Sequence, residues 1–172
     1  MKKKIFWWEI IGFTVSGVLG VLFHFLYSLS GKALWAAPLG SVNESTWEHM
    51  KLLFWAMFLF AIIQSFFFKD REDFWCVKVK SILIGLGLIP LIFYLYNGII
   101  GKSPDWINIA IFFVSLGVSY IYEAKRLNGE EKECASPQAA FFLLCIIAGL
   151  FIIFSFNAPN INIFADPLKK SV

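Results

Sequence analysis

Five long apolar segments separated by short polar stretches make up most of the chain. They cover residues 5–27, 52–68, 81–96, 107–122 and 139–156. A helix needs about 20 residues to cross a hydrocarbon layer of ~30 Å, and a helix satisfies its own backbone hydrogen bonds in lipid. The third and fourth segments are shorter, so we expect their helices to extend into the flanking turns. The pattern predicts an all-α bundle of five transmembrane helices in a single domain, residues 1–172.

Composition supports a membrane protein, because 59% of the residues are apolar, 19% are aromatic and only 16% are charged, unlike a soluble domain. We therefore expect a multi-pass protein of the cell membrane, with the lipid bilayer as its partner. A net charge of +3 gives no reason to expect a nucleic-acid partner. The sequence leaves open whether the protein is a monomer or a homo-oligomer. The sequence also has no glycine-rich phosphate loop, so we do not expect ATP-driven work by this chain.

The predicted spans divide the basic residues between two sides of the membrane. One side carries ten of them: Lys2, Lys3, Lys4, Lys69, Arg71, Lys78, Lys80, Lys125, Arg126 and Lys132. The other side carries five: Lys32, Lys51, Lys102, Lys169 and Lys170. Because basic residues concentrate in cytoplasmic loops, the count predicts a cytoplasmic N-terminus and an outer C-terminus. The segment 28–51 and the tail after Asn157 then face the outside.

Charged residues and cysteines on the predicted cytoplasmic side form no functional motif. Residues 69–73 and 123–133 are dense in both charge signs, which is typical of solvated connections. Cys76 and Cys134 fall on this side and Cys145 falls within the last span, with no C-x-x-C pair. We therefore expect neither a disulfide framework nor a thiol redox enzyme.

The most informative polar stretch is the heptapeptide N-E-S-T-W-E-H, residues 43–49, just before the second span. Ser45 and Glu48 form a capping-box pattern, in which the serine oxygen accepts the Glu48 N–H and the glutamate carboxylate accepts the Ser45 N–H. Trp47 suits the membrane interface. Three residues of the heptapeptide have no such local role: Asn43, Glu44 and His49.

The predicted topology brings two more polar residues to the same membrane face. His24 lies near the outer end of the first span and Asp166 lies in the outer tail. Histidine nitrogens with carboxylate oxygens suit zinc, iron or manganese, so His24, His49 and Asp166 are candidate ligands of a divalent transition metal. A water on such a metal can act as a nucleophile, with Glu44 or Glu48 as the candidate catalytic base. The metal-free alternative is a proton-titrating or ligand-binding pocket in which Glu44, Glu48 and His49 recognise a polar head group.

Three segments resemble a family of uncharacterised prokaryotic multi-pass membrane proteins. They are Leu22 to Tyr27 with His24 at its centre, the N-E-S-x-W-E-H heptapeptide followed by Lys51, and Phe164 to Pro167. The resemblance spans the whole chain and implies membrane residence but no activity or substrate. It also implies a shared site at His24, Asn43, Glu44, Trp47, Glu48, His49 and Asp166. The chain departs from the family pattern where Trp55-Ala56 replaces a proline and Leu168-Lys169-Lys170 replaces a glycine-rich end.

Three functional hypotheses follow, and they leave open whether the protein is an enzyme. The first is binding or transport of a small amphipathic or lipid-like ligand at an outer polar vestibule. The second is a metal-dependent membrane hydrolase or transferase that uses His24, Glu44, Glu48, His49 and Asp166. The third is an accessory membrane subunit, favoured by the small residues of the first span, which allow close helix packing: Gly12, Ser16, Gly17 and Gly20.

Overall fold

The computed structural model describes residues 2–101, 103–130 and 134–166. Its elements are α1 (Lys2–Leu29), η1 (Leu34–Ala36), α2 (Thr46–Ser65), α3 (Phe74–Ile99), α4 (Asp105–Asn128), α5 (Pro137–Phe156) and η2 (Asn162–Phe164). Several residues used in the sequence analysis lie outside the described residues: Lys102, Lys132, Pro167, Leu168, Lys169 and Lys170.

The all-α fold with five long helices confirms the expectation from hydropathy, and each helix is long and apolar enough to cross a membrane. Helices α3 and α4 extend beyond the predicted spans at both ends, as expected from their short apolar segments. Helix α2 begins at Thr46, six residues before the apolar segment that starts at residue 52 and directly after Ser45, the N-cap residue of the predicted capping box. Its first two turns carry charged residues that a hydropathy pattern places outside the membrane.

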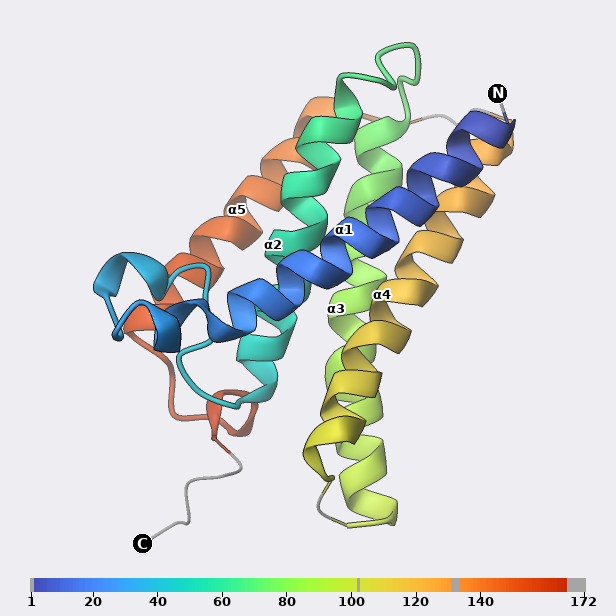
Figure 1. Ribbon diagram of the computed structural model, residues 1–172. Coiled ribbons are helices and arrows are strands. Elements are labelled where there is room, and N and C mark those ends of the chain that lie inside the picture. The colour runs from blue at the N-terminus through green and yellow to red at the C-terminus, as the bar shows by residue number, and fades with distance from the viewer. Residues whose placement is uncertain (1, 102, 131–133, 167–172) are drawn as a thin grey trace, which may run out of the picture.

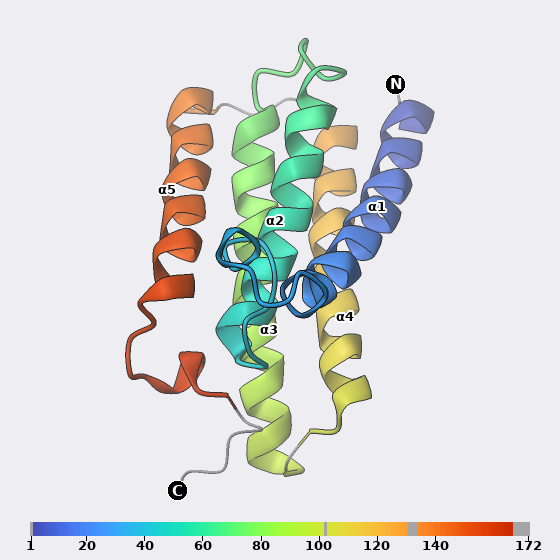
Figure 2. The same ribbon diagram turned by 60° about the vertical axis from the view of Figure 1, so that its left-hand side comes forward.

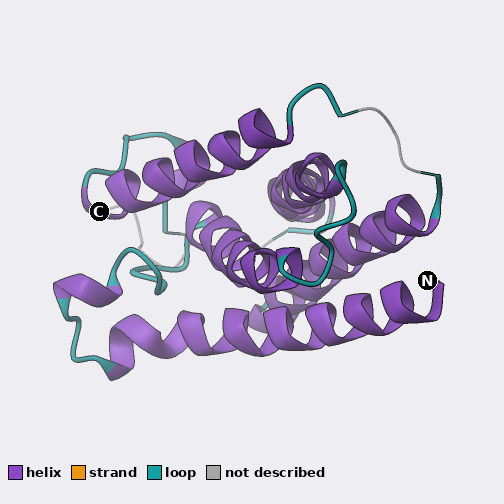
Figure 3. Cartoon of the chain, turned by 90° about the horizontal axis from the view of Figure 1, so that it is seen from above, coloured by secondary structure: helices purple, strands orange, loops and turns teal. Residues whose placement is uncertain are grey.

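Helices α2 and α3 lie at the centre of the bundle (Figure 1). Helix α1 crosses one side and contacts α2 and α4, while α5 packs on the other side against α3 and α2. Seen along the bundle, α1 and α5 lie on opposite sides (Figure 3). The N-terminus and the α2–α3 connection lie at one end, and the segment after α1 and the chain after α5 lie toward the other (Figure 2).

The distribution of side chains is that of a protein surrounded by lipid. Large apolar side chains are exposed on all five helices, for example Phe6, Ile63, Leu91, Ile121 and Phe142. Charged side chains lie inside instead, including Glu9, Glu48, Lys51, Lys78 and Glu123. Ionisable residues within membrane helices characteristically face the interior and pair with one another, so this pattern supports a multi-pass membrane protein.

The small residues of α1 are used within the bundle. A side-chain carbon added at Gly12 would clash with Tyr120 and Phe60, and one added at Gly20 would clash with Phe112. The Ser16 hydroxyl hydrogen-bonds the Tyr120 hydroxyl at 2.7 Å. These contacts join α1 to α2 and α4, so the small-residue face offers no free surface for another subunit.

Two expectations for the predicted cytoplasmic side are wrong. Glu123 belongs to α4 rather than to a solvated connection, and it forms a buried ion pair with Lys78 of α3, which was counted as a flanking basic residue. Cys76 and Cys134 form a disulfide, although no disulfide was expected. Both errors have the same cause. Lys78 and Glu123 are separated by 45 positions in the sequence, and the two cysteines by 58. Each pair meets only when the helices pack, which spacing along the chain does not reveal.

Candidate functional site

The loop between α1 and α2 lies against the last turns of α1. Gly40 makes this possible, because an added Cβ would lie 2.9 Å from the backbone nitrogen of Tyr27 and 3.2 Å from the carbonyl oxygen of Phe23. The next residue, Ser41, donates its N–H to that Phe23 carbonyl at 3.3 Å. The loop therefore enters the heptapeptide beside His24.

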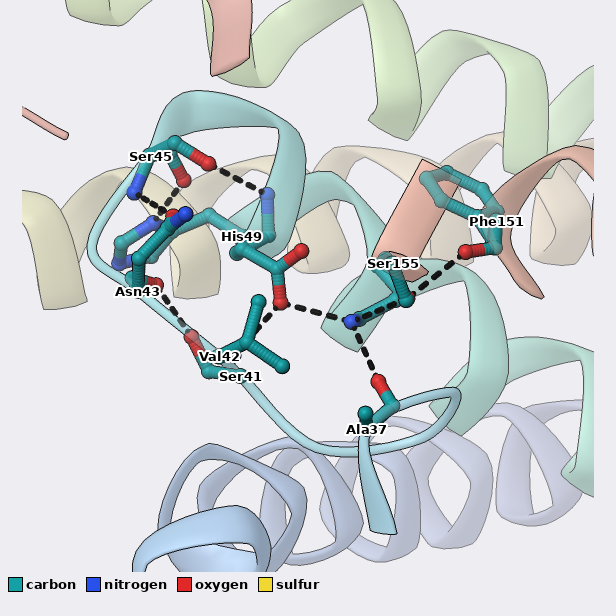
Figure 4. Close-up of polar contacts among 10 residues, drawn as sticks. Ala37, Ser41, Val42, Asn43, Ser45, His49, Phe151 and Ser155 are labelled. Carbon is teal, nitrogen blue, oxygen red and sulfur yellow. Dashed lines mark hydrogen bonds and ion pairs between the residues drawn. The ribbon is translucent and has the colours of Figure 1, made fainter. Parts of the chain in front are cut away.

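A local hydrogen-bond network shapes the turn into α2 (Figure 4). The Asn43 side-chain oxygen accepts the Ser45 N–H at 2.9 Å, and the Ser45 hydroxyl oxygen accepts the Glu48 N–H at 3.4 Å. Half of the predicted capping box is therefore confirmed. The other half is wrong: the Glu48 carboxylate accepts the Val42 N–H at 2.9 Å, because Asn43 already occupies the Ser45 N–H.

His24, Glu44 and His49 converge at this end of α1 and α2. The Nε2 atom of His24 is 3.7 Å from one Glu44 carboxylate oxygen, and Nε2 of His49 is 3.8 Å from the other. One donor atom from each residue lies within 4.8 Å of the other two. The Glu44 side chain is 39% exposed, so the group lies at the edge of the bundle with a side open to a ligand.

A backbone contact determines the tautomer of His49. Its Nδ1 atom is 2.9 Å from the Ser45 carbonyl oxygen, and a carbonyl can only accept, so Nδ1 carries the proton. In the neutral ring, Nε2 is then a lone pair facing the Glu44 carboxylate. This second contact is typical of metal-binding histidines, and two facing acceptors are stabilised by a positive ion between them.

The three donors would have to move closer together to hold a transition metal. With bonds of about 2.0–2.1 Å, neighbouring ligands of a tetrahedral zinc lie roughly 3.3 Å apart. The two histidine–carboxylate distances of 3.7 and 3.8 Å run to different Glu44 oxygens, and the three donors lie within 4.8 Å of one another, so binding would draw them together by up to about 1.5 Å. Three protein donors with open positions would suit a catalytic rather than a closed structural site.

Glu48, a candidate base, lies outside this group. Lys51 Nζ is 2.7 Å from its Oε2 atom, and the same ammonium donates to the carbonyl of Ala37 and the hydroxyl of Ser155 at 2.8 Å each. Figure 4 shows how these contacts tie together the loop, α2 and α5. Both charged side chains are buried, so Glu48 serves a buried ion pair and is not available as a base at the histidines.

Trp47 packs on aromatic rings, and Asp166 is not one of the three donors. The indole of Trp47 packs on Phe151, Phe154 and Phe164, with ring centroids 4.6, 5.5 and 4.6 Å away. Asp166 follows Phe164 by two residues and does not belong to the donor group. In the described residues, Glu44 therefore takes the place that the sequence analysis gave to Asp166 as third candidate ligand.

An apolar cavity adjoins the two histidines. Its volume is about 130 Å³, and it lies between α1, α2 and α4. His24 and His49 form its polar wall, and Val21, Phe25, Phe112 and Phe113 are among its apolar lining. The end of the bundle thus combines a polar group with an adjoining apolar space.

The sequence analysis missed a second polar cluster in the half of the bundle that contains the N-terminus. Glu9, Gln64, Lys78 and Glu123 come from four helices and are each at most 4% exposed. The sequence contained one indication of this cluster, because Glu9 lies within the predicted first span. Burying a carboxylate in lipid costs free energy, so such residues usually have a functional role.

The comparisons with known proteins identify a family but no activity. Neither a curated protein nor a solved structure matches this chain. One family of unknown function, DUF6512, matches residues 1–171. This match confirms the expected membership of an uncharacterised family. The chain belongs to the family of unknown function DUF6512.

Proposed function

We propose that this chain is a multi-pass protein of a prokaryotic cell membrane that binds a small amphipathic, lipid-like ligand at its outer face. The observation that carries the proposal is the convergence of His24, Glu44 and His49 beside an apolar cavity. A ligand with a polar head and an apolar tail matches both parts at once. Ligand sites typically combine apolar walls with a few well-placed polar groups.

The size of the cavity limits the ligand to partial burial. Sites that enclose a drug-sized molecule measure about 300–1,000 Å³, whereas this cavity measures about 130 Å³. It accommodates a short stretch of hydrocarbon next to the histidines. The remainder of a lipid tail would lie in the bilayer along α1 and α4, where Val21 and Phe25 are exposed.

A divalent transition metal would strengthen binding of an anionic head group. The tautomer of His49 and the proximity of the three donors support His24, Glu44 and His49 as its ligands. Phosphate or carboxylate oxygens of the ligand would fill the open metal positions.

The charge count supports the outer location, because nine basic residues flank one side and four flank the other when the buried Lys78 and Lys51 are left out. Cytoplasmic loops carry the excess of lysine and arginine. The histidine site lies toward the end of the bundle with fewer basic residues, together with the tail after α5. This orientation makes the site accessible from outside the cell.

A metal-dependent hydrolase or transferase is the second candidate function, because the three donors leave positions open for a water nucleophile. Glu44 would act as a ligand in this case, and Glu48 is engaged by Lys51. This function therefore requires the metal-bound water to be activated without either candidate base. Mass spectrometry of phospholipids incubated with the metal-loaded protein would detect cleaved or transferred groups.

Elemental analysis of the purified protein in detergent tests the metal site. The wild-type protein is expected to retain one zinc, iron or manganese per chain, and His24→Ala or His49→Ala is expected to lose it. Glu130→Gln, which removes an exposed carboxylate at the other end, is the control and should keep the metal. Equal metal content in the wild-type protein and both histidine variants would contradict the assignment.

Binding of a short-chain phospholipid, measured by native mass spectrometry, tests the ligand site. Val21→Trp fills the cavity and is expected to weaken binding at least about tenfold, a loss of ~1.4 kcal/mol. Val18→Trp is the matched control, because Val18 is an exposed residue of the same helix that does not line the cavity. If both tryptophan variants bind as the wild type does, the ligand proposal fails whether or not a metal is present.

A further inference from the structure

A second group of ionisable side chains is buried on the opposite half of α1 from His24. Glu9 precedes His24 by fifteen residues, or roughly 22 Å along a helix, so the two clusters are separate. Glu9 meets Gln64 of α2, Lys78 of α3 and Glu123 of α4. All four side chains come from different helices and are nearly inaccessible to solvent.

The contacts of Glu123 occupy both of its oxygens. Lys78 forms an ion pair with one carboxylate oxygen, and the Ser81 hydroxyl donates to the other at 2.6 Å. Glu123 therefore has the partners expected of a buried, ionised carboxylate. Lys78 is the one cation in this group of four side chains.

The contacts of Glu9 are incomplete. Its Oε1 atom accepts from the Gln64 amide at 3.0 Å, while its Oε2 atom is buried with no hydrogen-bond partner. The side-chain oxygen of Gln64 is also buried and unpartnered. The Glu9 carboxyl group interacts with that of Glu123, so an unpartnered oxygen lies in a group that already has one ionised carboxylate.

The net charge of the four side chains indicates that the cluster holds an additional proton. Two ionised carboxylates and one ammonium would leave a net negative charge enclosed by the bundle. Two carboxylates in contact cannot easily both ionise, and such pairs share a proton. A proton on Glu9 makes the cluster neutral and converts Glu9 from an acceptor into a donor toward Glu123.

We infer that Glu9 and Glu123 form an intramembrane proton-binding site, in which one proton is held between the two carboxyl groups and Lys78 balances the remaining charge. A proton fits better than a metal ion, because the Lys78 ammonium already occupies an oxygen of Glu123 and repels another cation. Buried carboxyl groups of this kind are characteristic of proton relays in membrane proteins.

The surroundings of Glu9 contain no second source of compensating charge among the described residues. Helix α3 contributes Lys78, and α4 contributes Glu123 and Tyr120. Helix α2 contributes Gln64, which does not titrate. The Tyr120 hydroxyl is bonded to Ser16, so the proton on Glu9 depends mainly on Lys78 and Glu123.

Infrared spectroscopy of the purified protein in liposomes tests this site, because a protonated carboxyl group has a carbonyl band distinct from that of a carboxylate. The wild-type protein is expected to show this band at neutral pH and to lose it reversibly at alkaline pH. Glu9→Gln should lack the band, and Glu130→Gln, an exposed carboxylate, should keep it. A wild-type spectrum without a titrating band, or a band unchanged in Glu9→Gln, would overturn the inference.

A second variant keeps the test decisive if Glu9→Gln fails to fold. In Glu123→Gln, Glu9 and Lys78 alone remain charged and balance each other, so Glu9 no longer needs a proton and the band should disappear. Thermal stability measured in sodium and in choline salts distinguishes a sodium site. Stabilisation by sodium at constant pH, without the infrared band, would show that the cluster binds a metal cation rather than a proton.

Discussion

Replacing Lys51 with methionine tests the buried ion pair at the start of α2. Lys51 is fully buried, and its ammonium group contacts Glu48, the Ala37 carbonyl and the Ser155 hydroxyl, all at 2.7–2.8 Å. Methionine keeps most of the side-chain volume but leaves the Glu48 carboxylate with only the Val42 N–H. Breaking a buried pair in this way typically costs about 3–5 kcal/mol, so we expect a loss of that size.

The double variant Lys51→Met with Glu48→Gln separates charge from packing. The amide oxygen of the introduced glutamine can still accept the Val42 N–H, and no uncompensated charge remains. The expected cost falls to that of unsatisfied neutral polar groups, about 1–3 kcal/mol. The second substitution should therefore restore about 2 kcal/mol to a protein that the first destabilised.

Unfolding by sodium dodecyl sulfate in mixed micelles, followed by circular dichroism, measures these free energies. The metal content of the single variant gives a second measurement, because the loop that carries Glu44 is tied down through Lys51. A loss below about 1 kcal/mol, the value of an exposed pair, would refute the buried ion pair. A double variant no more stable than the single one would show that lost packing, not charge, causes the effect.

Three further changes test other contacts. Gly40→Ala should lower the free energy of unfolding by about 1–3 kcal/mol and reduce metal content, because the added carbon meets backbone atoms; unchanged metal content would contradict the packing of the loop. Ser16→Ala removes a hydrogen bond from the buried Tyr120 hydroxyl and should cost about 1–3 kcal/mol, measured in the same titration. With a cytoplasmic N-terminus, a single cysteine placed at the exposed residue Glu130, in a variant whose three native cysteines are replaced by serine, should react with an impermeant maleimide only after permeabilisation; labelling in intact cells would reverse the orientation.

Hydropathy predicted the number of helices because each span contains a long apolar run, but it misplaced the start of α2. The first two turns of α2 contain Glu48, His49 and Lys51. Hydropathy averaged over these polar residues places them in water. In the structure, Glu48 and Lys51 neutralise each other inside the bundle. Pairing of opposite charges thus extends a helix beyond the limits that a residue-by-residue scale can detect.

The candidate site was predictable where local geometry and topology agree. His24, Glu44 and His49 meet because the chain turns back immediately after α1, and the heptapeptide then starts α2 beside it. The role of Glu48 could not be assigned from the sequence, since it depends on the buried pairing of Glu48 with Lys51. The pairing of Lys78 with Glu123 depends on the contact between α3 and α4, which the two loop-like charge patterns conceal.

Helix α5 is held near its two ends and along one narrow face that contains Leu144 and Ala148. Only 22% of the apolar stretch of α5 is buried inside the protein. The Cys76–Cys134 disulfide anchors the chain just before this helix, and Trp47 packs against Phe151 and Phe154 in its last turns. Between its ends, only the face of α5 with Leu144 and Ala148 is buried in the core. Its lipid-facing flank, which includes Phe142, Ile146 and Ile153, is thereby free to vary with the thickness and composition of the surrounding bilayer while the bundle stays the same.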